Sequence, residues 1–197
     1  MIKKYRMKYK IILLPIIFIL FSSISNYKKD INDEEDRIFW SNNRKLTWDD
    51  FKGIPDTIGK SNLILTTVAE TSSGISLENS NTNNSKNQYK IESIFLKNKS
   101  WTITNSLQIL AHEQLHFDLT ELYARKIRKA FDSLKIRKNF IEENYIKIYN
   151  SNIKQLNDIN DRYDNETYGN EMNQNKWIKK VDRELLKLKK YEYISAE

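Results

Sequence analysis

The chain has 197 residues, of which 39% are hydrophobic and 30% are charged, and it contains no cysteine. This length and composition exclude an intrinsically disordered chain and predict one globular domain that buries a hydrophobic core. Without cysteine, disulfides, thiolate metal ligands and a lipid-bearing N-terminal cysteine are also excluded.

The formal net charge of +7 arises mainly at the N-terminus. Five of the 33 basic residues stand in the first ten positions, so that 28 basic residues face 26 acidic ones in the rest of the chain. A body with balanced charge offers no basic surface for a polyanion. We therefore expect no nucleic-acid partner.

The basic start is followed by an apolar run, Ile11 to Phe21, and then by the small residues Ser23 and Ser25. This order is typical of a secretory signal peptide. The run is shorter than the roughly 18 residues that a membrane-spanning helix needs. We predict a signal peptide over residues 1–25 and an exported protein, either secreted or held in the periplasm or cell envelope. Membrane contact is then limited to this segment, as a cleaved signal or a retained anchor.

Residues 26–37 are polar and charged, which predicts a linker, and residues 38–197 are expected to form the folded domain. Residues 38–55 are dense in aromatic side chains that we expect to pack on the core. Two strand-like stretches follow at 63–77 and 89–103, the first with a possible bend at Gly74 and the second interrupted at 97–100. The polar residues 79–87 between them are typical of a hairpin connection or a mobile loop.

The remaining sequence has helical periodicity. We predict helices over residues 105–135, 139–162 and 171–191, with Thr104 or Asn105 as the N-cap of the first. The break between the last two falls at residues 167–170. The whole pattern predicts an α+β fold, in which a small, mostly antiparallel sheet packs on a long helix that is followed by two further helices.

The only two histidines, His112 and His116, flank Glu113 in an HExxH motif within the first predicted helix. Residues four apart lie on one helix face, so both imidazoles can bind one Zn²⁺ ion. Glu113 is then placed to accept a proton from a water activated by the ion. The motif predicts a zinc hydrolase site, and the alternative is that both histidines are ordinary helix residues.

A third zinc ligand must be a carboxylate or a water, because no third histidine exists. The best-placed carboxylates lie at residues 162–169, where the second predicted helix ends. Asp118 is expected either to support a ligand or to lie in solvent, and Glu121 to be a surface charge. Tyr168 could donate a hydrogen bond to a developing oxyanion, although packing is the more common role of such a tyrosine.

Several short strings spread over the chain together resemble a known family. They are Trp40, Leu46–Pro55, Ser100-Trp101, His112–Asp118, Ala124-Arg125, Tyr163–Thr167, Gln174 and Trp177. In these residues the chain resembles, from about residue 38 to about residue 180, the bacterial proteins described as predicted secreted zinc-dependent proteases, also catalogued as domain-of-unknown-function family 922. The resemblance implies a zincin-like fold, export, a bound zinc ion and activity on a peptide or protein substrate.

One departure from that family concerns the third ligand. The resemblance implies a His-Gly pair shortly after the Tyr163–Thr167 string, but this chain has no histidine there. Either Asp164 or Glu166 then completes the site, or this member binds metal weakly and is inactive. We favour Asp164 as the third ligand beside His112 and His116. The alternative to a metallopeptidase is a non-catalytic exported protein, a degenerate zincin that binds an envelope polymer or a protein partner.

Overall fold

The computed structural model describes residues 36–55, 67–79 and 89–193. Contacts divide the chain into residues 1–30 and 31–197, and only the second unit contains described residues. The predicted signal peptide, residues 26–35 of the predicted linker and the connection at 80–88 lie outside the described residues. Among the described helices, none combines the length and the apolar character that a membrane crossing requires.

The main sheet is antiparallel and has the strand order β1-β4-β3, and a separate short ladder pairs β2 with β5. The predicted interruption at 97–100 is a 3-10 turn (Lys97–Lys99) between β4 and β5, so the stretch 89–103 forms two strands. The predicted small antiparallel sheet is confirmed, with one unpredicted strand, β1. The strands are β1 (Arg37–Phe39), β2 (Ala69–Glu70), β3 (Ser73–Asn79), β4 (Tyr89–Leu96) and β5 (Trp101–Thr102).

The three helices are α1 (Leu107–Ile136), α2 (Glu142–Thr167) and α3 (Glu171–Lys187), followed by a 3-10 turn at Lys189–Tyr191. The N-cap of α1 is Ser106, whose hydroxyl accepts a hydrogen bond from the backbone N–H of Ile109, so the predicted caps at 104 and 105 are wrong. The class is α+β, as predicted.

Helix α2 continues beyond the predicted end at residue 162. It ends at Thr167: the C-cap Tyr168 already has a non-helical ψ of 111°, and Gly169 follows with a positive φ of 62°, which glycine adopts without strain. Asp164 and Glu166 consequently lie on the last turns of a helix, where their directions are determined by helix geometry.

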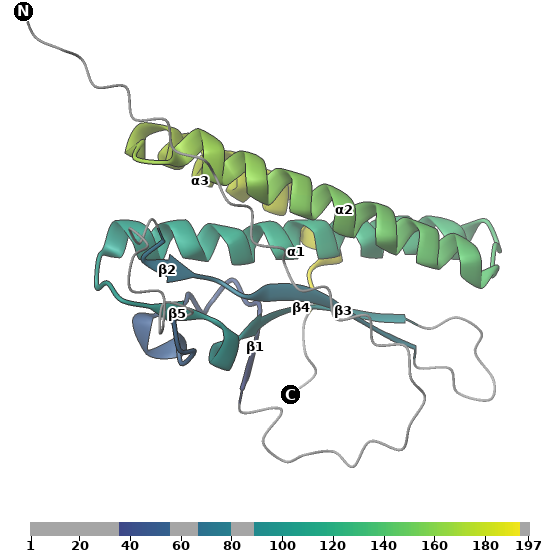
Figure 1. The fold of residues 1–197 in the computed structure, drawn as a ribbon. Coiled ribbons are helices and arrows are strands. Elements are labelled where there is room, and N and C mark those ends of the chain that lie inside the picture. Colours follow the sequence, from purple (N-terminus) through teal and green to yellow (C-terminus); the bar gives the residue numbers. More distant parts are fainter. Residues whose placement is uncertain (1–35, 56–66, 80–88, 194–197) are drawn as a thin grey trace, which may run out of the picture. The chain divides into compact units, whose positions relative to one another are not determined.

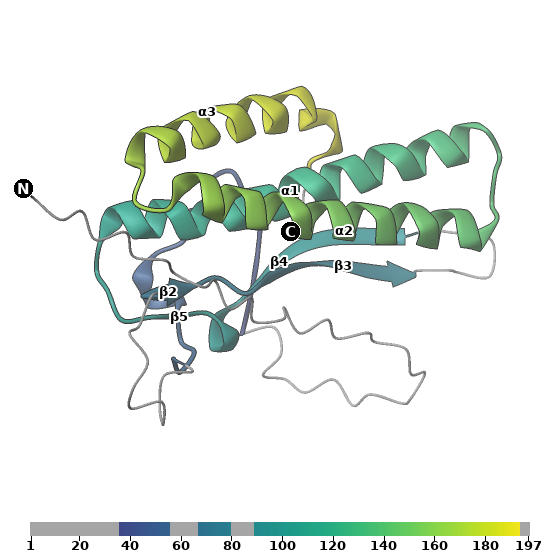
Figure 2. The same ribbon diagram turned by 45° about the horizontal axis from the view of Figure 1, so that its top comes forward.

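Helix α1 lies between the sheet on one side and α2 and α3 on the other (Figures 1 and 2). Phe117 of α1 packs against Phe95 of β4, and on the other side His116 of α1 packs against Tyr163 of α2, whose ring also packs against Trp177 of α3. Because neighbours cover α1 on both sides, polar residues away from the histidine face are also buried.

Glu121 is the clearest case, and its expected role as a surface charge is wrong. The residue is only 2% exposed. Its carboxylate accepts hydrogen bonds from Ser93 of β4 at 2.6 Å, from Arg125 at 2.8 Å and from Arg128 at 2.9 Å. Three donors satisfy the buried charge and tie α1 to the sheet.

Most of the predicted aromatic segment at 38–55 packs on the core, as shown by the buried Trp40 and Phe51, but Phe39 is 41% exposed. Polar contacts also attach the segment to α1. Trp40 donates its indole N–H to Asp118 at 2.6 Å, and the backbone N–H of Leu46 donates to Gln114 at 2.7 Å. Phe51 packs edge-on against Phe95. The segment therefore contacts α1 through hydrogen bonds that are separate from the contacts of α1 with the sheet and with α2.

Candidate metal centre

The HExxH motif lies in the first three turns of α1, where consecutive i→i−4 hydrogen bonds place His112 and His116 one above the other. Their Nε2 atoms lie 3.2 Å apart. The two imidazoles are mostly covered, with 23% and 14% of their side chains exposed. Both rings thus direct the same nitrogen toward one point on the α2 side of the helix.

Asp164 of α2 reaches the same point. Its Oδ1 atom lies 3.1 Å from Nε2 of His112 and 3.0 Å from Nε2 of His116. Three ligands about 2.1 Å from a tetrahedral zinc ion lie about 3.4 Å from one another, so the observed spacings of 3.0–3.2 Å come within a few tenths of an ångström of those around one small ion. Two imidazole nitrogens and a carboxylate oxygen are also a donor set that zinc accepts. The side chain of Asp164 is 53% exposed, which leaves the cluster open to solvent.

The Asp164 carboxylate and the two histidines stabilise each other's charged forms. Burial lowers the pKa of His116, but the hydrogen bond and charge of Asp164, the charge of Glu113 and the contact with Asn160 together raise it to about 9. Burial raises the pKa of Asp164, yet the hydrogen bonds and charges of the two histidines hold it well below its usual range. The site therefore stabilises an ionised Asp164 carboxylate next to a positive charge. A bound cation would supply the same positive charge.

Glu113 lies at the flank of the histidine face. Three residues of helix correspond to about 300° of rotation, so Glu113 is only about 60° around the helix from His116. The residue is 5% exposed, and its charge acts on both His116 and Tyr163. Within the described part of the chain, its carboxylate accepts no hydrogen bond, which leaves it available to a proton donor in the site.

The other predicted site residues lie elsewhere. Glu166 accepts a hydrogen bond from the indole N–H of Trp177 at 2.9 Å, so it is directed to α3 rather than to the histidines. Tyr168 is 76% exposed, which excludes the expected packing role. Asp118 contacts Trp40, Gln114 and Lys45, and the expectation that it supports a histidine or lies in solvent is wrong. Two residues correspond to about 200° of helix rotation, so Asp118 points away from His116.

Three further residues of α2 contact the histidines and were not predicted from the sequence. Asn160 places Oδ1 at 3.1 Å from Nδ1 of His116, and Thr167 places its hydroxyl at 3.5 Å from Nδ1 of His112. Tyr163 stacks on His112, with ring centroids 4.5 Å apart and 19° between the planes. Their spacing relative to Asp164 was the available signal, but the predicted helix end at residue 162 concealed it.

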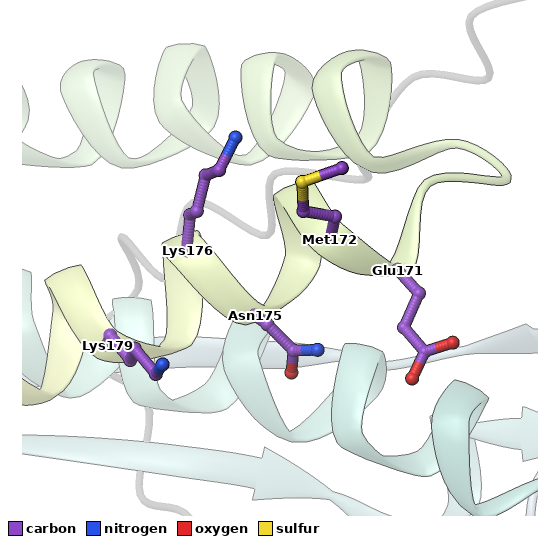
Figure 3. Close-up of a pocket in the computed structure, with 5 residues that line it drawn as sticks. All are labelled: Glu171, Met172, Asn175, Lys176 and Lys179. Carbon is purple, nitrogen blue, oxygen red and sulfur yellow. The ribbon is translucent and has the colours of Figure 1, made fainter.

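An open pocket of about 520 Å³ lies apart from this cluster (Figure 3). All the described side chains that line it come from one face of α3, and none belongs to the candidate site. Its described lining residues include neither a histidine nor a group of carboxylates, so the His-His-Asp cluster is the stronger candidate for chemistry. The lining residues are Glu171, Met172, Asn175, Lys176 and Lys179.

No family model, curated protein or solved structure matches the chain. The resemblance to the predicted secreted zinc-dependent proteases therefore stays a prediction that depends on the motif residues alone.

Proposed function

We propose that this protein is an exported zinc-dependent metallohydrolase that cleaves peptide bonds, with a zincin-like arrangement of its HExxH helix. The observation that carries the proposal is the convergence of His112 Nε2, His116 Nε2 and Asp164 Oδ1, all within 3.2 Å of one another. Residues from two helices would then serve as three zinc ligands, and the 53% exposure of the Asp164 side chain leaves the cluster accessible to water.

Zinc, when bound by these residues, supplies the positive charge that polarises a peptide carbonyl and acidifies an attacking water. Glu113 would take the proton of that water onto its carboxylate and then return it to the leaving amine as the C–N bond breaks. His112 and His116 of α1 and Asp164 of α2 would hold the ion while Glu113 moves the proton. Export and the peptide substrate are part of the proposal and derive from the N-terminal sequence and the family resemblance.

The test combines metal content with hydrolysis. Metal-free protein is incubated with Zn²⁺, freed of excess ion and assayed for zinc and for cleavage of fluorescently labelled casein. We expect about one zinc per chain and measurable cleavage. Glu113→Gln should keep the zinc and lose cleavage by about 10²- to 10⁴-fold, the usual contribution of a general base.

Glu184→Gln serves as the matched control, because the Glu184 carboxylate forms an exposed ion pair with Lys187 and interacts through its charge with Lys126 and Arg183, none of which belongs to the candidate site. It should equal the unmodified protein in both measurements. Wild-type protein that takes up no zinc would contradict the metal site. Zinc uptake without casein cleavage would contradict the peptidase activity and favour the non-catalytic alternative.

A further inference from the structure

Four residues on one face of α2 contact the two histidines. Asn160, Tyr163, Asp164 and Thr167 follow one another at i, i+3, i+4 and i+7, the spacing of a single helix face. Each of the four contacts His112 or His116. Asp164 alone contacts the Nε2 atoms, whereas Asn160 and Thr167 contact the Nδ1 atoms at the opposite side of each ring.

The chemistry of these contacts specifies where the ring protons lie. Oδ1 of Asn160 can only accept, so the 3.1 Å contact requires an N–H on Nδ1 of His116. The hydroxyl of Thr167 donates its proton to the carbonyl of Tyr163 at 2.7 Å, which leaves its oxygen free to accept from Nδ1 of His112 at 3.5 Å. An imidazole that keeps its proton on Nδ1 offers the lone pair of Nε2 to a metal.

Tyr163 restrains the rings in a different way. Its side chain is completely buried, and it contacts His112 face to face at 4.5 Å and His116 edge-on at 5.1 Å. A 180° flip of either imidazole would have to displace this ring, which is itself held against Trp177 at 5.5 Å. The tyrosine thereby keeps both Nε2 atoms on the side of Asp164.

We propose that Asn160, Tyr163 and Thr167 are positioning residues, which keep a proton on Nδ1 of both imidazoles and direct both Nε2 atoms toward Asp164, where a metal ion can replace an Nε2 proton. This inference rests on the proposed function, since it concerns how the same site is prepared for its ion. Asn160 is the strongest of the three, because its contact is short and it acts on the more buried histidine. The contact of Thr167 is longer, and we expect it to contribute less.

The first test is zinc affinity, measured by competition with a fluorescent chelator. Asn160→Ala should weaken zinc binding by about 10- to 100-fold, the range for residues that orient a ligand without touching the metal. Asn160→Asp keeps the acceptor and should restore affinity to within about threefold of wild type or better. Asn152→Ala is the matched control, because within the described residues this amide donates to the carbonyl of Ile148, one turn earlier in α2, and has no contact with either histidine.

The second test needs no zinc. The chain has two histidines, so ¹⁵N NMR of metal-free protein resolves the protonation of each ring nitrogen. At a pH at which these spectra show His116 to be neutral, the fraction of His116 with its proton on Nδ1 should be larger in wild type than in Asn160→Ala. Asn160→Ala should shift that proton toward Nε2, whereas Asn152→Ala should not.

An Nδ1–H fraction of His116 that is no larger in wild type than in Asn160→Ala would overturn the inference. So would an Asn160→Ala protein that keeps both the Nδ1–H tautomer and the zinc affinity of wild type. Should wild-type protein bind no zinc at all, the proposed function fails, while the NMR measurement still decides the role of Asn160.

Discussion

The imidazole of His112 and the carboxylate of Asp164 lie 3.1 Å apart, measured from Nε2 to Oδ1, although 52 residues separate them in the sequence. The contact exists because α1 and α2 are antiparallel neighbours whose packing brings the first turns of one beside the last turns of the other (Figure 2). Metal binding and the packing of these two helices are therefore linked.

Asp164→Asn should lower zinc affinity by more than about 100-fold, beyond the range for a residue outside the ligand set. Glu166→Gln is the matched control, since Glu166 contacts Trp177 and not the histidines. It should change the affinity by less than about threefold. Competition titration with a chelator measures both. The reverse order of effects would make Glu166 the ligand and contradict the geometry described above.

Zinc affinity should rise with pH. Below its pKa of about 9 His116 holds a proton on the nitrogen that faces Asp164, and zinc must displace that proton. The apparent affinity should increase about tenfold per pH unit between pH 6.5 and pH 9 and level off above pH 9. Titrations at several pH values check this. A flat profile over this range would show that His116 is not protonated before zinc binds.

The metal-free protein should show the opposite trend in stability. The pKa of His116 in the folded state, about 9, lies above the unfolded value of 6.5. Its contribution to stability is therefore complete below pH 6.5 and disappears as the pH rises through 9. The pKa of Asp164 is lowered on folding, so its contribution is present above the unfolded value of 3.8 and is lost as the pH falls.

Urea unfolding of wild type and His116→Gln, without metal, checks the pH trend. The difference in the free energy of unfolding should be larger at pH 5.5 than at pH 10, by at most about 3 kcal/mol. Equal differences at both pH values would contradict the ion pair.

Glu121→Gln should destabilise the fold strongly. The substitution leaves Arg125 and Arg128 without their common charged partner in a buried place, which typically costs about 3–5 kcal/mol. The same change at Glu184, in an exposed pair with Lys187, should cost less than about 1 kcal/mol. Chemical denaturation of both variants makes the comparison. Similar small losses would mean that Glu121 lies in solvent.

Asp118→Ala should separate stability from metal binding. It leaves the buried indole N–H of Trp40 without an acceptor, which costs about 1–3 kcal/mol in the free energy of unfolding. Zinc affinity of the folded variant should stay within about threefold of wild type, because Asp118 points away from the histidines. A large loss of zinc affinity in folded protein would instead support its role as a partner of a ligand.

Local patterns allowed several correct predictions. The apolar periodicity of residues 105–135 predicted α1 to within a few residues, and the spacing of His112 and His116 predicted that their rings share a face. The interruption at residues 97–100 and the antiparallel sheet were also predicted correctly. Turn and strand preferences depend on a few neighbouring residues, which the sequence shows directly. The window at residues 162–169 included Asp164, although the helix that carries it extends farther than predicted.

The errors have a common physical origin. The apolar periodicity of α1 indicated one buried face, and Glu121 lies outside that face, so it was expected in solvent. It is buried because the sheet covers another side of α1. Asn160 and Thr167 were missed because their role depends on how α2 is aligned against α1. Hydrogen bonds between neighbours in the chain determine spacing along one helix, and the sequence alone reveals that spacing. The meeting of His112, His116 and Asp164 depends instead on side-chain packing between helices far apart in the chain, which only the folded protein establishes.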